Sequence, residues 1–270
     1  MQLSKHSQAP RSDLLRALVP ATWCRDTLGL DPDPWQQKVL ESRSRFSILA
    51  CARQVGKSTI VAVKVIHRAM TRPGSMVLII APSLRQSIEL MTKVRNLLKF
   101  AGAKLVSDNK TEAELANGSR IVALPGSEDT VRGFSAVDLI VIDEAAFAKD
   151  DLYYSVYPMI QISRGSMILL SSAYITNGFY YDIWHGSDER WERHRITAYE
   201  CPRYDHAELE YLRESIPAKK FQCEYLAEFV DPEGAAFTAE QIEAMFDNDV
   251  VPFGMDNENA ILDDRVEAFG

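Results

Sequence analysis

The chain has 270 residues, of which 46% are hydrophobic and 25% are charged, and its formal net charge is −8. This composition is typical of a globular protein with one sizeable core and room for a small second unit, and it excludes disordered and collagen-like chains. The acidic balance argues against a protein that binds nucleic acid over its whole surface, although a local basic patch is still possible. No apolar run approaches the length of a membrane span and no signal peptide begins the chain, so we expect a cytoplasmic protein.

Residues 1–34 are rich in proline, which predicts an N-terminal segment with a short helix or two and a turn-rich approach to the core. Short apolar runs of the kind found in strands buried on both faces then follow. They are FSILAC (46–51), MVLIIA (76–81), RIVALP (120–125), VDLIVID (137–143) and SMILLSS (166–172). Helical patterns at 57–70 and 83–100 separate several of these runs, and Ser83 is the expected N-cap of the second helix. The alternation predicts an α/β fold over residues 35–190, with a mostly parallel sheet and helices on both faces.

From about residue 190 the sequence becomes charged and helix-prone, and no further buried-strand signal of comparable strength is present. We expect a small helical subdomain over residues 191–250. The acidic, irregular stretch at 251–270 is typical of a linker.

The stretch CARQVGKST, residues 51–59, resembles the phosphate-binding loop G-x-x-x-x-G-K-[ST], but Cys51 stands in place of the first glycine. In such a loop, backbone N–H groups surround the phosphates, the lysine reaches the terminal phosphate and the next hydroxyl binds Mg²⁺. That second half is intact, so we assign the metal-binding hydroxyl to Ser58. The residues expected to bind nucleotide are Gln54, Gly56, Lys57, Ser58 and Thr59. A chance G-K-S-T at a helix start is the alternative.

A second motif supports nucleotide binding. VDLIVIDEAAF, residues 137–147, is an apolar strand that ends in two adjacent carboxylates. Asp143 is expected to hold the Mg²⁺ shell, and Glu144 to orient and deprotonate the attacking water. An Asp-Glu pair after a strand also occurs as a helix cap. Two motifs in the right order, each after a buried strand, favour ATP hydrolysis.

Two further groups are expected beside the nucleotide. The strand at 166–172 ends in Ser171 and Ser172, whose hydroxyls would arrive at the γ-phosphate edge of the sheet and sense that phosphate. Upstream, in DPDPWQQKVL, Gln36 would read the edge of adenine while Trp35 packs against the base. The alternative is that Gln36 is only a surface helix residue.

With these residues placed, the chain resembles the ATPase portion of the terminase large subunit of tailed bacteriophages, the motor that packages double-stranded DNA into procapsids. The resemblance covers roughly residues 30–250. That family often replaces the first loop glycine and carries an arginine inside the loop, here Arg53, which implies that Cys51 is tolerated and that nucleotide binds. Other similar stretches are PGSMVLIIAPSLRQS, the V-R-G tripeptide before VDLIVIDEAAF, the coupling residues Ser172 and Ala173, and FQCEYLAEFVDPEGAAF. At Tyr174 the chain departs from the family, which more often has Pro or Asn there.

The resemblance implies a P-loop NTPase of the RecA-like ASCE class, with residues 191–250 as a lid subdomain. It implies ATP and Mg²⁺ as cofactors. The implied partners are double-stranded DNA, the portal protein, the small terminase subunit and further copies in a ring of about five on a procapsid in the host cytoplasm, with a monomer when isolated. Family members continue into a nuclease domain, so we expect residues 251–270 to lead towards an absent nuclease domain and expect no nuclease activity in this chain.

Two arginines compete for the role of stabilising the γ-phosphate during hydrolysis. The resemblance matches Arg132 to an arginine that acts across the subunit interface in part of the family, whereas Arg53 is placed to act in cis. The alternative for Arg132 is a solvent-exposed turn residue. Candidate DNA-facing cations are Lys104, Lys110 and Arg120, although scattered cations often belong to a solvated face.

Two other functions remain open at this point. A helicase would need a second RecA-like lobe, for which the segment after residue 190 is too short. A nucleotide-binding assembly module that does not turn over ATP would have no need of Glu144.

Overall fold

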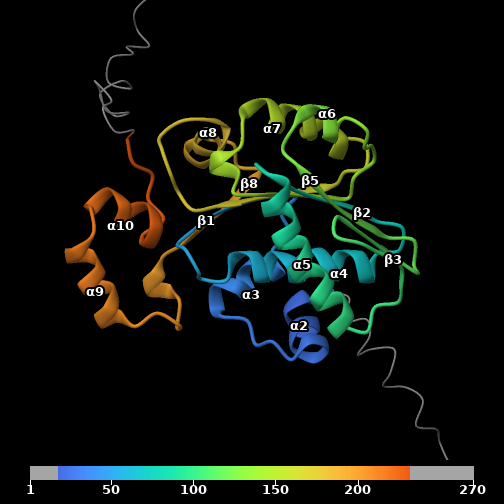
Figure 1. The fold of residues 1–270 in the computed structure, drawn as a ribbon, viewed down its shortest axis with the longest axis horizontal. Coiled ribbons are helices and arrows are strands. Elements are labelled where there is room, and N and C mark those ends of the chain that lie inside the picture. The colour runs from blue at the N-terminus through green and yellow to red at the C-terminus, as the bar shows by residue number, and fades with distance from the viewer. Residues whose placement is uncertain (1–17, 232–270) are drawn as a thin grey trace, which may run out of the picture. The chain divides into compact units, whose positions relative to one another are not determined.

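The computed structural model describes residues 18–231, and its contacts divide the chain into two units, Met1–Val230 and Asp231–Gly270. Every helix and strand described below lies in the first unit (Figure 1). The predicted linker at 251–270, the end of the predicted lid and the first 17 residues lie outside the described part. Within that part, no helix is both long enough and apolar enough to cross a membrane.

A sheet of eight strands forms the centre of the described region, in the spatial order β3-β4-β5-β2-β6-β7-β1-β8. In this spatial order, each strand from β5 through β2, β6, β7 and β1 to β8 pairs with its neighbour in parallel. The pairs β3-β4 and β4-β5 are antiparallel. The strands are β1 (Phe46–Cys51), β2 (Met76–Ala81), β3 (Leu105–Asp108), β4 (Glu112–Leu115), β5 (Arg120–Pro125), β6 (Leu139–Asp143), β7 (Ser166–Ser171) and β8 (Trp191–Ile196). The prediction of a mostly parallel sheet is confirmed.

Helices cover both faces of the sheet, as predicted (Figure 1). On one face lie α2 (Pro20–Leu28), α3 (Pro34–Glu41), α4 (Lys57–Thr71) and α5 (Leu84–Phe100). On the other face lie α6 (Glu128–Val131), α7 (Asp150–Val156) and α8 (Phe179–His185). Short 3-10 turns are η1 (Ala145–Phe147), η2 (Tyr157–Ile160) and η3 (Ala198–Glu200), and two more helices follow, α9 (His206–Ser215) and α10 (Ala218–Tyr225). Ser83 caps α5 as predicted, because its hydroxyl accepts from the N–H of Gln86.

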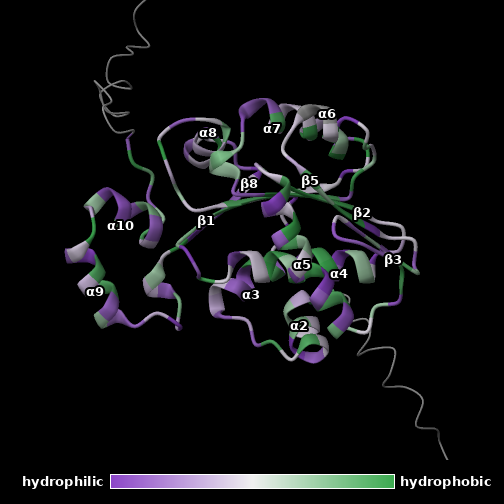
Figure 2. Cartoon of the chain, viewed as in Figure 1, coloured by the Kyte–Doolittle hydropathy of each residue, from purple (hydrophilic) through white to green (hydrophobic). Residues whose placement is uncertain are grey.

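Successive residues of each central strand pack into different cores. In β1, Leu49 joins the cluster shared with α3, α4 and α5, whereas Ile48 joins the cluster shared with α7 and α8. The same alternation holds for Val77 and Leu78 in β2. Because both faces are covered, these strands are largely apolar, as the hydropathy colouring shows (Figure 2).

The sequence has no buried-strand signal of comparable strength after residue 190, but the sheet has one more strand there. β8 pairs in parallel with β1, with His194 opposite Leu49. It escaped recognition because it is the last strand of the sheet, and only Trp191 and Ile196 of its six residues are buried. Charged residues are common on such edge strands because they discourage pairing with other chains. The division between core and lid at residue 190 stays a prediction, but the sheet itself continues to Ile196.

Candidate functional site

The loop between β1 and α4 has the backbone geometry of an anion-binding site. Gly56 precedes α4 with a φ of 97°, and Gln54 also has a positive φ of 56°. Within the described residues, the backbone N–H groups of residues 54–58 donate to no protein acceptor. The first turn of α4 adds its positive dipole end to these donors. The loop therefore offers several N–H groups to a negatively charged ligand.

Cys51 ends β1 inside the core and is fully buried. Burial raises the pKa of its thiol to about 12, which makes it an unreactive packing residue. The next residue, Ala52, donates its N–H to the carbonyl of Ile196 at 2.7 Å. The substituted glycine position thus belongs to the strand, and the loop that follows keeps its anion-binding geometry.

Four predicted site residues meet where three neighbouring strands end. The Lys57 Nζ lies 3.0 Å from Glu144 Oε1 and donates to Ser172 Oγ at 3.4 Å. The Ser171 hydroxyl donates to Glu144 Oε2 at 3.2 Å. They come together because β7 lies between β1 and β6, so the carboxyl ends of all three strands share one edge. Ligands of open α/β sheets bind at such an edge.

The two adjacent carboxylates differ in their surroundings. Asp143 is buried, and its Oδ1 accepts from the N–H of Glu144 at 3.0 Å. Burial, and then the neighbouring charge of Glu144, raise the pKa of Asp143 to about 6. Glu144 has a φ of 51°, a left-handed conformation that costs a non-glycine residue about 1–2 kcal/mol. It precedes η1 without a side-chain capping bond, so the helix-cap alternative is wrong for Glu144.

The donor set suits a magnesium ion that is shared with phosphates. Mg²⁺ takes oxygen ligands and is commonly bound through one or two carboxylates together with substrate phosphates. Asp143 offers a buried carboxylate whose raised pKa shows that its negative charge lacks compensation. No group of three or more His, Cys, Asp or Glu residues that could hold a metal occurs in the described part of the chain. This chemistry is compatible with Mg²⁺, and its assignment to Asp143 and Ser58 stays a prediction.

Gln36 lies against the phosphate loop and is not a surface residue. Its side chain is buried, and its Oε1 accepts from the N–H of Asp33 at 2.9 Å. Its Nε2 would lie 3.0 Å from a Cβ built on Gly56. The surface alternative for Gln36 is therefore wrong, whereas its predicted contact with adenine stays a prediction.

Arg203 also contacts the loop, and sequence reasoning missed it. Its NH2 donates to the carbonyl of Val55 at 2.7 Å and pairs with Asp33 Oδ2 at 2.8 Å. The hydrogen bond with Asp33 raises the pKa of Arg203. No motif surrounds this arginine, and it lies 148 residues after Val55, so only the folded chain reveals it.

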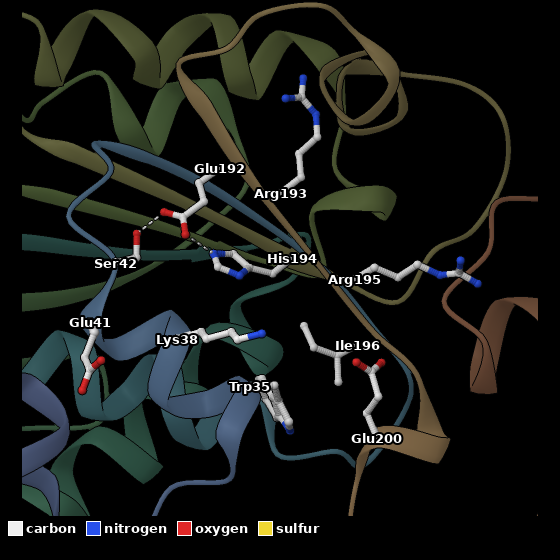
Figure 3. Close-up of a pocket in the computed structure, with 10 residues that line it drawn as sticks. All are labelled: Trp35, Lys38, Glu41, Ser42, Glu192, Arg193, His194, Arg195, Ile196 and Glu200. Carbon is white, nitrogen blue, oxygen red and sulfur yellow. Dashed lines mark hydrogen bonds and ion pairs between the residues drawn. The ribbon is translucent and has the colours of Figure 1, made fainter.

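A pocket of about 510 Å³ lies beside Trp35, between α3 and β8 (Figure 3). It is lined by Trp35, Lys38, Glu41, Ser42, Glu192, Arg193, His194, Arg195, Ile196 and Glu200. In Figure 3 Trp35 and Ile196 lie near one end of the pocket, and Ser42 and Glu192 near the other. Trp35 is buried, belongs to the core and also lines this pocket. Its packing against adenine stays a prediction.

The two candidate arginines lie in different surroundings. Arg53 is exposed, and its NH1 lies 3.2 Å from Glu224 Oε1 in α10. The Tyr204 hydroxyl also donates to the carbonyl of Arg53 at 2.7 Å. Arg132 is exposed and lies on the turn after α6. The assigned roles of both arginines stay predictions.

The candidate DNA-facing cations are not equivalent. Arg120 pairs with Glu112 on the neighbouring strand, with an N–O distance of 2.7 Å. Lys104 and Lys110 are exposed. A contact between these residues and DNA stays a prediction.

Comparison with known proteins decides the family. Residues 48–244 match the family described as terminase large subunit, T4likevirus-type, N-terminal. The chain belongs to this family. The terminase large subunit of Escherichia phage T5 is 28% identical over 222 residues, which cover 77% of this chain and 50% of that protein. That of Thermus virus P23-45 is 24% identical over 188 residues, which cover 62% of this chain and 39% of that protein. The chain thus spans at most half the length of these relatives.

Solved structures of terminases confirm the predicted fold. The large terminase ATPase domain of Thermus phage P74-26 has a TM-score of 0.70 at 21% identity, covering 79% of this chain and 100% of that domain. The large terminase of a thermophilic bacteriophage in complex with ATP-γ-S has a TM-score of 0.60 at 11% identity, covering 80% of this chain and 52% of that one. The large terminase of bacteriophage HK97 has a TM-score of 0.62 at 15% identity, covering 74% of this chain and 51% of that one. This terminase chain therefore has the RecA-like P-loop fold.

Proposed function

We propose that this terminase chain hydrolyses ATP to drive double-stranded DNA into a procapsid in the host cytoplasm. One observation carries the proposal: Lys57 contacts Glu144 and Ser172, and Ser171 contacts Glu144. These residues lie at the end of a loop whose N–H groups, at residues 54–58, have no protein acceptor among the described residues. Membership of the terminase family supports the proposal and argues against a helicase.

The contacts of Lys57 define a reaction geometry. Its ammonium would bind the β- and γ-phosphates, while the N–H groups of residues 54–58 bind the remaining oxygens. Because Lys57 also pairs with Glu144 at 3.0 Å, phosphate oxygens would compete with this carboxylate for the same ammonium. Glu144, still oriented by the Ser171 hydroxyl, would then accept a proton from the attacking water. Mg²⁺, when held by Ser58 and Asp143, would neutralise charge on the phosphate oxygens.

Phosphate release and ATP binding test the proposal together. Lys57→Ala should abolish hydrolysis and weaken ATP binding, because the loop loses its cation. Glu144→Gln should retain ATP but lose turnover, since the amide fills the same space and cannot take the proton. Lys104→Ala, which removes an exposed lysine far from the loop in sequence, is the charge-matched control for the first variant. Wild-type protein that binds ATP without releasing phosphate would favour the assembly module instead.

We assign Arg132 to the site of an adjacent subunit in a homo-oligomeric ring, and Arg53 to its own γ-phosphate. An arginine inserted beside the γ-phosphate accelerates transfer by about 10³–10⁵. The exposure of Arg132 supports the assignment, because a residue that acts on a neighbour must reach the surface. The portal protein and the small terminase subunit are proposed as further partners.

Mixing two inactive variants tests the role of Arg132. Rings that contain both Arg132→Ala and Glu144→Gln subunits have some interfaces with one subunit's Glu144 and the next subunit's Arg132 intact. We expect these interfaces to recover part of the hydrolysis. No recovery in rings shown to be mixed would return Arg132 to the role of an exposed turn residue.

A further inference from the structure

A small cationic pocket lies at the opposite edge of the sheet, where β1, β6 and β7 begin. It measures about 70 Å³. Its lining consists of Ser42, Arg43, Ser44, Lys64, Arg68, Leu139, Ser166 and Ile168. Three cations and three hydroxyls thus line the pocket, and no carboxylate does. Because β1 has six residues that each rise about 3.3 Å, this pocket lies about 20 Å from the phosphate loop.

Lys64 is partly buried and faces only uncharged acceptors. Its Nζ donates to the carbonyls of Val39 at 2.7 Å and Ser42 at 3.4 Å, at the end of α3. An ammonium has three donors, so one N–H remains for a ligand. Burial lowers the pKa of Lys64 to about 8, even though the charge of Glu192 acts in the opposite direction. The protein thus leaves this ammonium short of compensating negative charge.

Arg68 is in a similar position one turn further along α4. Its NH1 donates to the carbonyl of Asp138 at 3.4 Å, and burial, followed by the charge of Arg72, lowers its pKa. The Asp138 carboxylate is already engaged, since it pairs with Arg72 at 3.1 Å and accepts from the N–H of Met76 at 3.0 Å. Among the described residues, most of the five N–H donors of Arg68 therefore have no protein acceptor.

The other nearby carboxylate is engaged as well. Glu192 accepts from the hydroxyl of Ser42 and lies 3.3 Å from His194 Nε2. Figure 3 shows both contacts among the residues that line the larger pocket. Among the described residues, neither carboxylate forms an ion pair with Lys64 or Arg68, although the charge of Glu192 acts to raise the pKa of Lys64 and that of Asp138 acts to raise the pKa of Arg68.

We propose that this pocket binds one phosphate group. Partly buried cations without a counter-ion are unfavourable, and an anion that brings several acceptor oxygens removes that cost. Arginine, lysine and hydroxyl donors around one small volume match a tetrahedral oxyanion. The volume is several times the ~10–15 Å³ that a water molecule requires, and it is too small for a nucleotide. The phosphate belongs either to the backbone of a nucleic acid or to a free anion.

The first experiment separates this pocket from the phosphate loop. Inorganic phosphate is titrated into the full chain carrying Lys57→Ala, in which anion binding at the loop is weakened, and binding is followed by calorimetry. Adding Arg68→Gln should weaken the remaining binding by about tenfold or more, the effect of one lost charged hydrogen bond. Adding Arg85→Gln, which removes an exposed arginine of α5, should change it by less than about twofold.

A second variant guards against a folding defect. Ser166→Ala removes one hydroxyl of the lining and leaves all charges in place, so it should weaken phosphate binding without changing the thermal unfolding temperature. Loss of all phosphate binding in Lys57→Ala alone would overturn the proposal, because the loop would then be the sole site. Unchanged binding in both folded pocket variants would overturn it too.

The two sources of the phosphate are separated with a short DNA duplex. If the site takes a backbone phosphate, Arg68→Gln should weaken duplex binding and reduce the slope of log K against log salt by about 0.9. If it takes a free anion, the variant should affect inorganic phosphate and leave duplex binding unchanged. Either result supports a phosphate site, and the absence of both effects contradicts it.

Discussion

The buried carboxylate of Asp143 is expected to lower the stability of the folded protein. Asp143 is 7% exposed, and burial and then the charge of Glu144 raise its pKa from 3.8 to about 6. The folded state therefore binds more protons than the unfolded state between these two pH values, so the free energy of unfolding falls as the pH rises through that window. Above pH 6 the full cost of the buried charge is present. Asp143→Asn removes that charge and should stabilise the protein at neutral pH.

The magnitude follows from the pKa. At about 1.36 kcal/mol for each pKa unit, a rise from 3.8 to about 6 corresponds to about 3 kcal/mol. This is an upper limit, because the new amide keeps the acceptor for the N–H of Glu144 but brings two donors that need partners. We expect a gain of about 1–3 kcal/mol. For a chain of this size, each kcal/mol raises the melting temperature by about 2–4 °C.

Thermal unfolding in the presence of a chelator measures the effect. Asp143→Asn should melt above the wild-type protein at about pH 7.5, and the difference should shrink towards about pH 4, where the wild-type carboxyl is protonated. Excess Mg²⁺ with ATP should stabilise the wild-type protein more than the variant. Glu214→Gln, which removes an exposed carboxylate of α9, controls for net charge. A variant that is less stable than wild type at pH 7.5, or a gain that does not depend on pH, would refute the reasoning.

Three further outcomes are expected. Glu144→Gln should bind ATP with affinity within about threefold of wild type in equilibrium binding, and a collapse of affinity in a folded variant would place Glu144 in the binding shell. Gly165→Ala should lower the free energy of unfolding by more than about 2 kcal/mol in denaturant titration, because its Cβ would lie 2.2 Å from the carbonyl oxygen of Val137. The control Gly133→Ala should change the free energy of unfolding little, because a Cβ there would have no atom within 4 Å. Arg203→Ala should raise the KM for ATP and leave the fold intact, since it removes a bond to the loop backbone; an unchanged KM would show that the loop holds its shape without it.

The sequence was sufficient for the parts of the fold that are buried on both faces. Strands such as β1 and β6 have continuous apolar runs because helices cover them on each side, and these runs were recognised with small errors at their ends. β8, β3 and β4 lie at or near the edges of the sheet and have few consecutive buried residues. Their pairing is set by neighbours that are distant in sequence. A local hydropathy pattern therefore does not identify them.

The same distinction applies to the site. Lys57 and Glu144 lie in motifs that each follow a buried strand, so their location at one edge of the sheet could be anticipated, whereas their contact at 3.0 Å was not predicted. Arg203 contributes through the fold alone, and nothing in its local sequence separates it from other surface arginines. The partner of Arg53, Glu224, was equally inaccessible, because it depends on how α10 lies against the loop.

The segment after β8, most of which was predicted to form a helical subdomain, makes hydrogen bonds with the phosphate loop. The backbone N–H of Arg53 donates to the carbonyl of Glu224 at 2.8 Å, and Arg203 binds the carbonyl of Val55. Further along, the N–H of Val230 donates to the carbonyl of Tyr174 at 2.9 Å, next to the end of β7. Because these bonds occupy the N–H of Arg53 and the carbonyl of Val55, they leave the N–H groups of residues 54–58 available to an anion. The shape of the phosphate loop thus depends on contacts from residues after β8 as well as on the motif itself.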